Sequence, residues 1–158
     1  CGSMPGKLAE LVRARAIPTV IWAQRWDRVL FDTASGAEVG RSSAQGGPAM
    51  LAAMERTIAR LPAGTRVILV GNSPTAWAAG DHMEGGWLRC DAYINHACAP
   101  VFPASQAEGR KINALLRDFA ARHRGMVYID AAAPFCEGGQ CRIIQDGVLN
   151  YWDGSHMT

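Results

Sequence analysis

The carboxyl end of the sequence places an acid and an imidazole three residues apart, at Asp153 and His156. A tight turn can present both side chains to one pocket, where the carboxylate fixes the imidazole tautomer and the other ring nitrogen takes a proton from a serine hydroxyl. The spacing therefore makes Asp153 and His156 candidates for an acid–base pair that activates a serine. Two alternatives stay open, because this spacing often arises by chance and residues 154–157 match a sequence that tag removal commonly leaves.

A serine to complete this pair is harder to find in the sequence. Ser3 precedes a predicted helix, but no predicted strand comes before it to hold it at the end of a sheet. Ser73 follows a predicted strand, and Pro74 behind it favours a structural turn. Ser155 lies between the acid and the imidazole, where the turn should direct it away from the ring. We therefore predict that the attacking serine lies outside this chain and that the chain alone has no serine-esterase activity.

The composition is that of a globular domain. Hydrophobic residues make up 49% of the 158 residues and charged residues 19%, so one domain with a buried core is expected over residues 1–158. The formal net charge of +2 is too small to indicate a nucleic acid or a membrane surface as partner. The sequence also lacks an apolar run of about 18 residues, the length that a transmembrane helix needs.

Four of the five cysteines form two closely spaced pairs. Cys136 and Cys141 enclose a flexible Glu-Gly-Gly-Gln segment, and Cys90 and Cys98 enclose another short segment. These spacings favour two local disulfides and therefore an oxidising compartment outside the cytoplasm. A metal site is the alternative, but neither pair has the spacing that zinc sites usually show, so no metal and no cofactor are expected. Cys1 is left over.

Helices and strands are predicted to alternate along the chain. Helical spacing of apolar residues predicts helices over residues 5–16, 48–61 and 106–123, and short apolar runs predict strands over residues 19–23, 66–70 and 126–130. Residues 32–47 and 74–105 have no clear period and are predicted to be loops, while Asp146-Gly147 predicts a hairpin. The alternation favours a parallel sheet with helices on both faces.

Polar side chains follow two of the predicted strands, at the end where parallel sheets bind their ligands. Gln24, Arg25 and Trp26 follow the first strand, and Asn72 follows the second. The amides of Gln24 and Asn72 are candidates to stabilise an oxyanion, and Trp26 is a candidate to contact substrate. For each amide the alternative is an ordinary cap or turn residue at the end of a strand.

The long predicted loop over residues 74–105 holds Trp77 and Trp87 together with Cys90 and Cys98. A connection of this length in a compact domain is often functional. One interpretation is a disulfide-closed flap whose tryptophans contact substrate. The other is a plain surface loop with its aromatic side chains tucked beneath it, and the sequence favours neither.

Three features together resemble a known family. A strand ends in Gln24-Arg25-Trp26, and another runs through residues 66–71 with Pro74 soon after it. The tail then carries the most specific pattern, which comprises Cys136, Cys141, Gly147, Tyr151, Asp153, His156, Met157 and Thr158. With these features the chain resembles the SGNH (GDSL-like) hydrolases. It is most similar to the extracytoplasmic SGNH domain of membrane acyltransferases that O-acetylate surface polysaccharides.

The resemblance implies a three-layer α/β/α fold with a central parallel sheet of flavodoxin-like topology. It also implies a Ser-His-Asp mechanism in which Asp153 and His156 act without metal or cofactor. The family's first strand, which ends in Gly-Asp-Ser, and its last helix have no counterpart in the sequence, so the domain is expected to be trimmed at both ends. The family's Gly-x-Asn-Asp oxyanion motif is absent as well.

The function implied by the resemblance is O-acetyl transfer to a cell-surface polysaccharide. The substrates would be a glycan and an acyl donor, and the domain would be tethered to a membrane acyltransferase domain, in the periplasm or at the cell surface. Two alternatives to acetyl transfer remain open. The first is a carbohydrate O-acetylesterase. The second is a non-catalytic module that binds glycans through exposed tryptophans such as Trp77 and Trp87.

Overall fold

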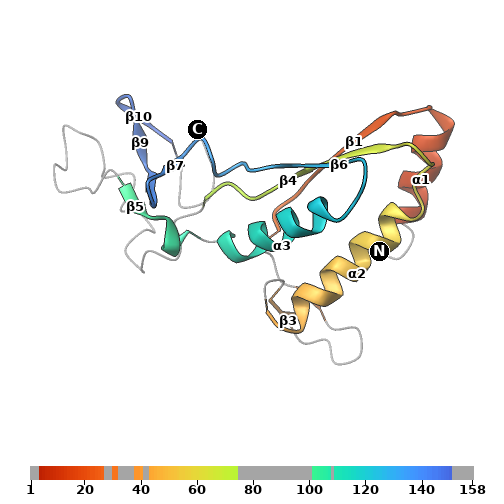
Figure 1. Ribbon diagram of the computed structural model, residues 1–158, viewed down its shortest axis with the longest axis horizontal. Coiled ribbons are helices and arrows are strands. Elements are labelled where there is room, and N and C mark those ends of the chain that lie inside the picture. The colour runs from red at the N-terminus through yellow and green to blue at the C-terminus, as the bar shows by residue number, and fades with distance from the viewer. Residues whose placement is uncertain are drawn as a thin grey trace. The chain divides into compact units, whose positions relative to one another are not determined.

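The structure is a computed structural model that describes residues 4–26, 30–31, 38–40, 43–74, 101–107 and 109–150 (Figure 1). The chain separates into two compact units. The first comprises Cys1–Gly71 and Ile112–Ile129, and the second comprises Asn72–Lys111 and Asp130–Thr158. Compact units of this kind do not define separately folding domains, so one domain over residues 1–158 stays a prediction.

The first unit is built on a parallel sheet of three strands, β1 (Thr19–Ala23), β4 (Arg66–Val70) and β6 (Met126–Ile129). The order is β1-β4-β6, and both neighbouring pairs run parallel. The predicted bounds of β1 and β4 are confirmed residue for residue, and β6 ends one residue earlier than predicted. Three adjacent parallel strands connected by helices confirm the predicted α/β class.

Three helices connect and precede these strands, namely α1 (Met4–Ala14), α2 (Gly46–Ile58) and α3 (Arg110–Ala121). α2 begins two residues earlier than predicted, and the Ser43 hydroxyl accepts a hydrogen bond from the N–H of its first residue, Gly46, at 2.9 Å. That contact satisfies one of the backbone donors that a helix start leaves open. α3 begins later than predicted, because Ala104–Gln106 form a separate 3₁₀ helix, labelled η3.

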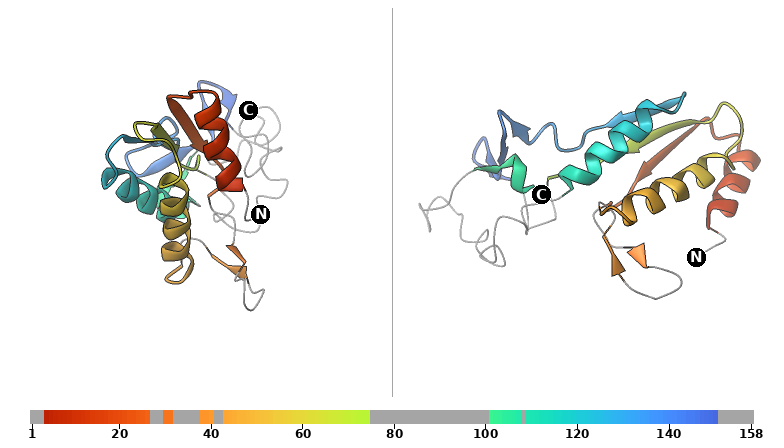
Figure 2. Two further views of the ribbon diagram at one scale, coloured as in Figure 1. Left: turned by 90° about the vertical axis from the view of Figure 1, so that its right-hand side faces the viewer. Right: turned by 60° about the horizontal axis from the view of Figure 1, so that its bottom comes forward.

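The core of the first unit lies between the sheet and the helices α2 and α3, which run along the same side of the strands (Figures 1 and 2). Eight buried side chains form it: Trp26, Met50, Met54, Leu69, Ile112, Leu116, Phe119 and Ala120. Leu69 of β4 and Leu116 of α3 have no exposed surface at all. Burial of such apolar side chains is the main source of stability in a fold of this kind.

The opposite face of the sheet carries exposed apolar side chains. Ile21 is 68% exposed, Val127 is 50% exposed and Ile129 is 46% exposed. The register pairs Ile21 with Ile68 and Ile68 with Val127, so these residues share one face. The prediction of helices on both faces therefore holds for the face beneath α2 and α3, while the other face is open at these three positions.

The prediction of a loop over residues 32–47 is wrong in part. β3 (Glu38–Val39) lies within this range and pairs antiparallel with β2 (Leu30–Phe31). The first residues of α2 also lie within the range. Strands of two residues are too short to show the alternation of apolar and polar side chains by which strands are recognised in a sequence.

The described residues of the second unit form two small antiparallel sheets. One has the order β5-β8-β7, from β5 (Val101–Pro103), β8 (Gln140–Arg142) and β7 (Cys136–Glu137). The other pairs β9 (Ile144–Gln145) with β10 (Val148–Leu149). Asp146 and Gly147, at φ 52° and 78°, form the turn between β9 and β10. The hairpin predicted at this pair is therefore confirmed, with the positive φ angles that a tight two-residue turn requires.

The prediction of a loop over residues 74–105 is wrong for its last residues, which form β5 and the start of η3. Phe102 of β5 is 4% exposed and packs with Cys141 and Ile143 in the core of the second unit. A strand of three residues with one buried side chain has no period to detect, and its pairing partner β8 is distant in the sequence. Residues 75–100 lie outside the described residues.

A charged contact links α2 to the residues that follow α3. His123 Nε2 lies 2.9 Å from a carboxylate oxygen of Glu55, and His123 Nδ1 lies 2.7 Å from the carbonyl oxygen of Phe119. Both ring nitrogens thus face acceptors, and only the imidazolium can donate to both. The Phe119 carbonyl, followed by Glu55, raises the pKa of His123 above its ordinary value of 6.5, although partial burial opposes the shift.

The raised pKa of His123 predicts a stability that falls with rising pH. The pKa is higher in the folded state than in the unfolded state, so protonated His123 contributes stability that is fully present below about pH 6.5. This contribution is lost as the pH rises through the folded-state pKa. Urea unfolding from about pH 5.5 to 8.5 should show the decline. The same decline in a His123→Gln variant would contradict the assignment, and Glu55→Gln should weaken it.

Candidate functional site

The three parallel strands of the first unit end at one edge of the sheet, and polar residues follow each of them. Gln24 and Arg25 follow β1 and are exposed. Asn72 follows β4 after one glycine and is 8% exposed. Asp130 follows β6 directly. Parallel sheets bind ligands at the carboxyl ends of their strands, so each of these residues is a candidate by its place directly after a strand.

A small hollow of about 150 Å³ lies between β1 and α2. Its walls come from Trp22, Gln24, Trp26, Ala49, Met50, Ala53, Met54 and Thr57. Two residues singled out from the sequence, Gln24 and Trp26, thus border the same hollow. Its lining is largely apolar, with the Gln24 amide as the longest polar side chain.

Trp26 holds the ends of two strands together. Its indole Nε1–H donates to the Val70 carbonyl oxygen at 2.7 Å, and its ring centroid lies 5.8 Å from that of Trp22. The side chain has no exposed surface. A fully buried ring offers little area to a sugar, so this position favours a packing role, and the contact of Trp26 with substrate stays a prediction.

Gly71, between β4 and Asn72, was not recognised from the sequence as a site residue. Its backbone N–H donates to the Ile129 carbonyl oxygen at 2.9 Å. A Cβ atom at this position would collide with the hydroxyl oxygen of Tyr128 and lie 3.0 Å from Asn113 Oδ1. Only glycine fits there without a shift of its neighbours. A larger residue would therefore disturb the backbone directly before Asn72. A glycine directly behind a buried strand is the signal that could have indicated it.

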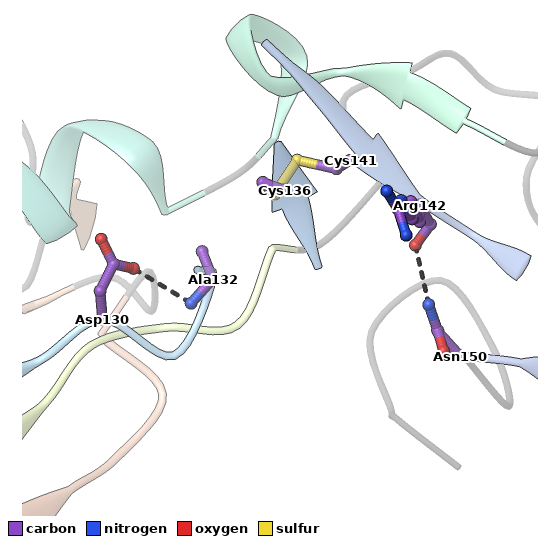
Figure 3. The surroundings of a disulfide bond; sticks show 6 residues. All are labelled: Asp130, Ala132, Cys136, Cys141, Arg142 and Asn150. Atoms are coloured by element: carbon purple, nitrogen blue, oxygen red, sulfur yellow. Dashed lines mark hydrogen bonds between the residues drawn. A yellow bond between two sulfur atoms is a disulfide. The ribbon is translucent and has the colours of Figure 1, made fainter. Parts of the chain in front are cut away.

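Asp130 ends β6 with a local turn. One of its carboxylate oxygens accepts a hydrogen bond from the Ala132 N–H at 3.1 Å (Figure 3). Short bonds of this kind, from an aspartate to the backbone two residues on, are typical of turns. The turn directs the chain into the hairpin that contains Cys136 and Cys141.

The predicted disulfide between Cys136 and Cys141 is confirmed, and it joins facing positions of β7 and β8 (Figure 3). The two Cα atoms are 4.0 Å apart. Gly138 and Gly139, at φ 58° and 81°, make the turn between the strands. Cys141 is fully buried against Phe102. The prediction for Cys90 and Cys98 concerns residues outside the described part of the chain.

Asn150 anchors the chain immediately before the segment that contains Asp153 and His156. Its side-chain Nδ2–H donates to the Arg142 carbonyl oxygen at 3.2 Å, as Figure 3 shows, and its backbone N–H donates to the Ile143 carbonyl oxygen at 2.8 Å. Both acceptors lie directly after the disulfide cysteine of β8. The residue directly before this segment is therefore tied to the disulfide hairpin.

Replacement of both Cys136 and Cys141 by serine is expected to lower the free energy of unfolding by about 2 kcal/mol. The chain-entropy estimate for so short a disulfide loop gives about this value. Urea unfolding of the oxidised protein and of the double variant would measure the difference. Mass mapping of non-reduced peptides provides the control, and alkylation of both thiols without prior reduction would contradict the pairing.

Several residues named from the sequence lie outside the described part of the chain: Ser3, Trp77, Trp87, Cys90, Cys98, Ser155, Asp153 and His156. Their roles stay predictions. Ser73 is described and is half-buried beside the buried Pro74. The candidate residues that the structure describes are Gln24, Trp26, Asn72, Cys136 and Cys141.

No group of three or more histidine, cysteine, aspartate or glutamate side chains in the described ranges is arranged to hold a metal ion. None of the helices in those ranges combines the length and the apolar character needed to span a bilayer.

Comparison with family models gives one match over the whole length of the chain. Residues 1–158 match the model described as SGNH domain (fused to AT3 domains). Neither the curated proteins nor the solved structures gave a match. The match confirms the resemblance stated from the sequence, and it agrees with the parallel sheet and helices of the first unit.

Proposed function

Because the chain belongs to the family of SGNH domains that are fused to AT3 domains, we propose that it performs O-acetyl transfer to a cell-surface polysaccharide. Family membership supports acyl-ester chemistry on carbohydrate and attachment to an acyltransferase of the membrane. The structural observation that carries the finer proposal is the buried amide of Asn72 at the carboxyl end of β4. A buried amide in this position suits the stabilisation of a developing oxyanion.

The proposed reaction passes through an acyl-enzyme. A serine from outside residues 1–158 attacks the acetyl carbonyl carbon while His156 takes its proton. The resulting tetrahedral oxyanion collapses, the bond to the donor's leaving group breaks, and His156 returns the proton to that group. A sugar hydroxyl then gives its proton to His156 and attacks the acyl carbonyl of the acyl-enzyme. The bond between the serine oxygen and the acyl carbon breaks and His156 returns the proton to that oxygen, which releases the acetylated glycan and restores the serine.

Within this scheme, Asp153 keeps the imidazole of His156 in the reactive tautomer and stabilises the imidazolium. Asn72 is our first choice for the oxyanion donor, because its side chain is buried and a buried amide loses little energy to reorganisation. Gln24 is the second choice, since it is exposed beside the hollow between β1 and α2. No metal or cofactor enters the proposed steps.

The proposed location is outside the cytoplasm, on the periplasmic side of the membrane or at the cell surface. The disulfide between Cys136 and Cys141 supports it, because such bonds persist in oxidising compartments. Fusion to AT3 domains, as the family description states, supports a tether to the membrane through another part of the parent protein.

Labelling with a serine-reactive fluorophosphonate tests the proposed mechanism. The complete parent protein should be labelled on one serine outside residues 1–158, and an acetyl donor should compete with the label. The isolated chain should take up no label. Peptide mapping by mass spectrometry locates the modified residue, and an assay with the polysaccharide present or absent separates transfer from hydrolysis.

The outcomes discriminate between the candidate functions. Label on Ser3, Ser73 or Ser155 would overturn the placement of the nucleophile. Release of free acetate that the polysaccharide does not suppress would identify an O-acetylesterase instead. A parent protein that takes no label and transfers no acetyl group, yet binds glycan, would overturn the enzyme assignment in favour of a binding module.

A further inference from the structure

Gly109, just before α3, packs its bare Cα against the side chain of Asn72. A Cβ atom at Gly109 would lie 2.9 Å from both Cβ and Nδ2 of Asn72, and 3.4 Å from its Cγ. Real side chains essentially never approach so closely. Gly109 also has a φ of 81°, a backbone conformation that disfavours any residue with a side chain.

The contact with Asn72 distinguishes Gly109 from glycines of the same backbone conformation. Gly64 and Gly125 have φ angles of 84° and 85°, and a Cβ atom at either position would meet no atom within 4 Å. A side chain would strain the backbone at all three glycines, but of the three only Gly109 packs closely against an amide side chain. Substitution of Gly64 or Gly125 is therefore a matched control for substitution of Gly109.

The segment that precedes Gly109 in the sequence pairs with the disulfide hairpin of the second unit. β5 pairs with β8, and the Ala104 N–H donates to the Gly139 carbonyl oxygen at 2.8 Å. η3 (Ala104–Gln106) follows β5 and ends three residues before Gly109 in the sequence. Gly109, which bounds one side of Asn72, therefore lies shortly after a strand that pairs with the disulfide-bonded strand β8.

We propose that Gly109 is a positioning residue that fixes the amide of Asn72 for oxyanion stabilisation. This inference rests on the proposed function, in which Asn72 is the donor. An oxyanion donor acts only within about 2.7–3.1 Å of the oxygen, and a misplacement of about 1 Å can cost about 10²-fold in rate. A methyl group at Gly109 would displace the amide by pressing on its Cβ and Nδ2.

The test compares Gly109→Ala with Gly125→Ala in the complete parent protein, with acetyl transfer as the assay. Gly109→Ala should lower kcat by about 10- to 100-fold more than Gly125→Ala, with little change in KM. In an Asn72→Ala background, Gly109→Ala should cause no further loss, because no amide remains to be displaced. Equal kcat values for the two glycine variants would overturn the inference.

Thermal unfolding keeps the inference testable if Gly109→Ala folds poorly. Asn72→Gly should then raise the Tm of the Gly109→Ala variant towards that of Gly125→Ala, because it removes the side chain that the new methyl group meets. No recovery of Tm would overturn the inference. If Asn72→Ala leaves kcat unchanged, the oxyanion role of Asn72 in the proposed function fails and this inference fails with it. If Asn72→Ala lowers kcat while Gly109→Ala and Gly125→Ala have equal kcat values, the oxyanion role of Asn72 stands and only the positioning role of Gly109 fails.

Discussion

His156→Ala in the complete parent protein is expected to lower kcat for acyl transfer by about 10⁶-fold while the fold stays intact. The imidazole is proposed to carry the proton in both halves of the reaction, so no other group replaces it. Asp153→Asn should cost about 10⁴-fold, because the carboxylate only orients and stabilises the ring. Turnover of an aryl acetate and of the natural acceptor would measure both losses.

Unfolding measurements on the same variants provide the control for this experiment. The two variants should match the unsubstituted protein in Tm and far-ultraviolet circular dichroism, since neither residue is proposed to stabilise the core. Near-normal turnover by His156→Ala would show that the acid–base pair has been wrongly assigned. If the two substitutions lowered kcat equally, Asp153 would do more in the reaction than orient the imidazole ring.

Trp26→Ala is expected to destabilise the first unit by about 3–5 kcal/mol, the range observed for large buried aromatic side chains. The ring has no exposed surface and belongs to the same buried core as Met50, Met54 and Leu69. The substitution also removes the hydrogen bond to the Val70 carbonyl oxygen. Chemical denaturation followed by circular dichroism would measure the change in the free energy of unfolding.

Trp26→Phe serves as the matched variant, because it keeps an aromatic ring and removes the indole N–H. Its cost should be less than half that of Trp26→Ala, with about 1 kcal/mol from the lost hydrogen bond. If Trp26→Ala proved as stable as the unsubstituted protein, the packing role would be wrong. The ring would then be better regarded as a substrate contact, as the sequence first indicated.

The sheet and its helices could be predicted from the sequence because their signals are local. β1 and β4 are continuous apolar runs, preceded by Pro18 or a short turn and followed by polar residues or glycine. α3 carries its apolar side chains at helical spacing, which predicts both the helix and its buried face. The disulfide hairpin could be predicted from two cysteines around a flexible segment.

The remaining features could not be predicted because they depend on contacts between distant residues. β5 becomes a strand only by pairing with β8, and the buried Phe102 alone gives no period. Gly109 is one of many glycines in the sequence, and its contact with Asn72 arises from the folded arrangement. The bonds of Asn150 to two backbone carbonyls likewise leave no pattern in the sequence.

The anchoring of Asn150 beside the disulfide has a consequence for the maturation of the protein. The segment that contains the proposed acid–base pair, Asp153 and His156, directly follows a residue whose two hydrogen-bond acceptors come directly after Cys141 in the sequence. Before export the two thiols are reduced, and the hairpin that carries those acceptors is not yet cross-linked. We therefore expect activity to be acquired when the cysteines are oxidised, so that newly made protein stays inactive towards cytoplasmic esters until it has crossed the membrane.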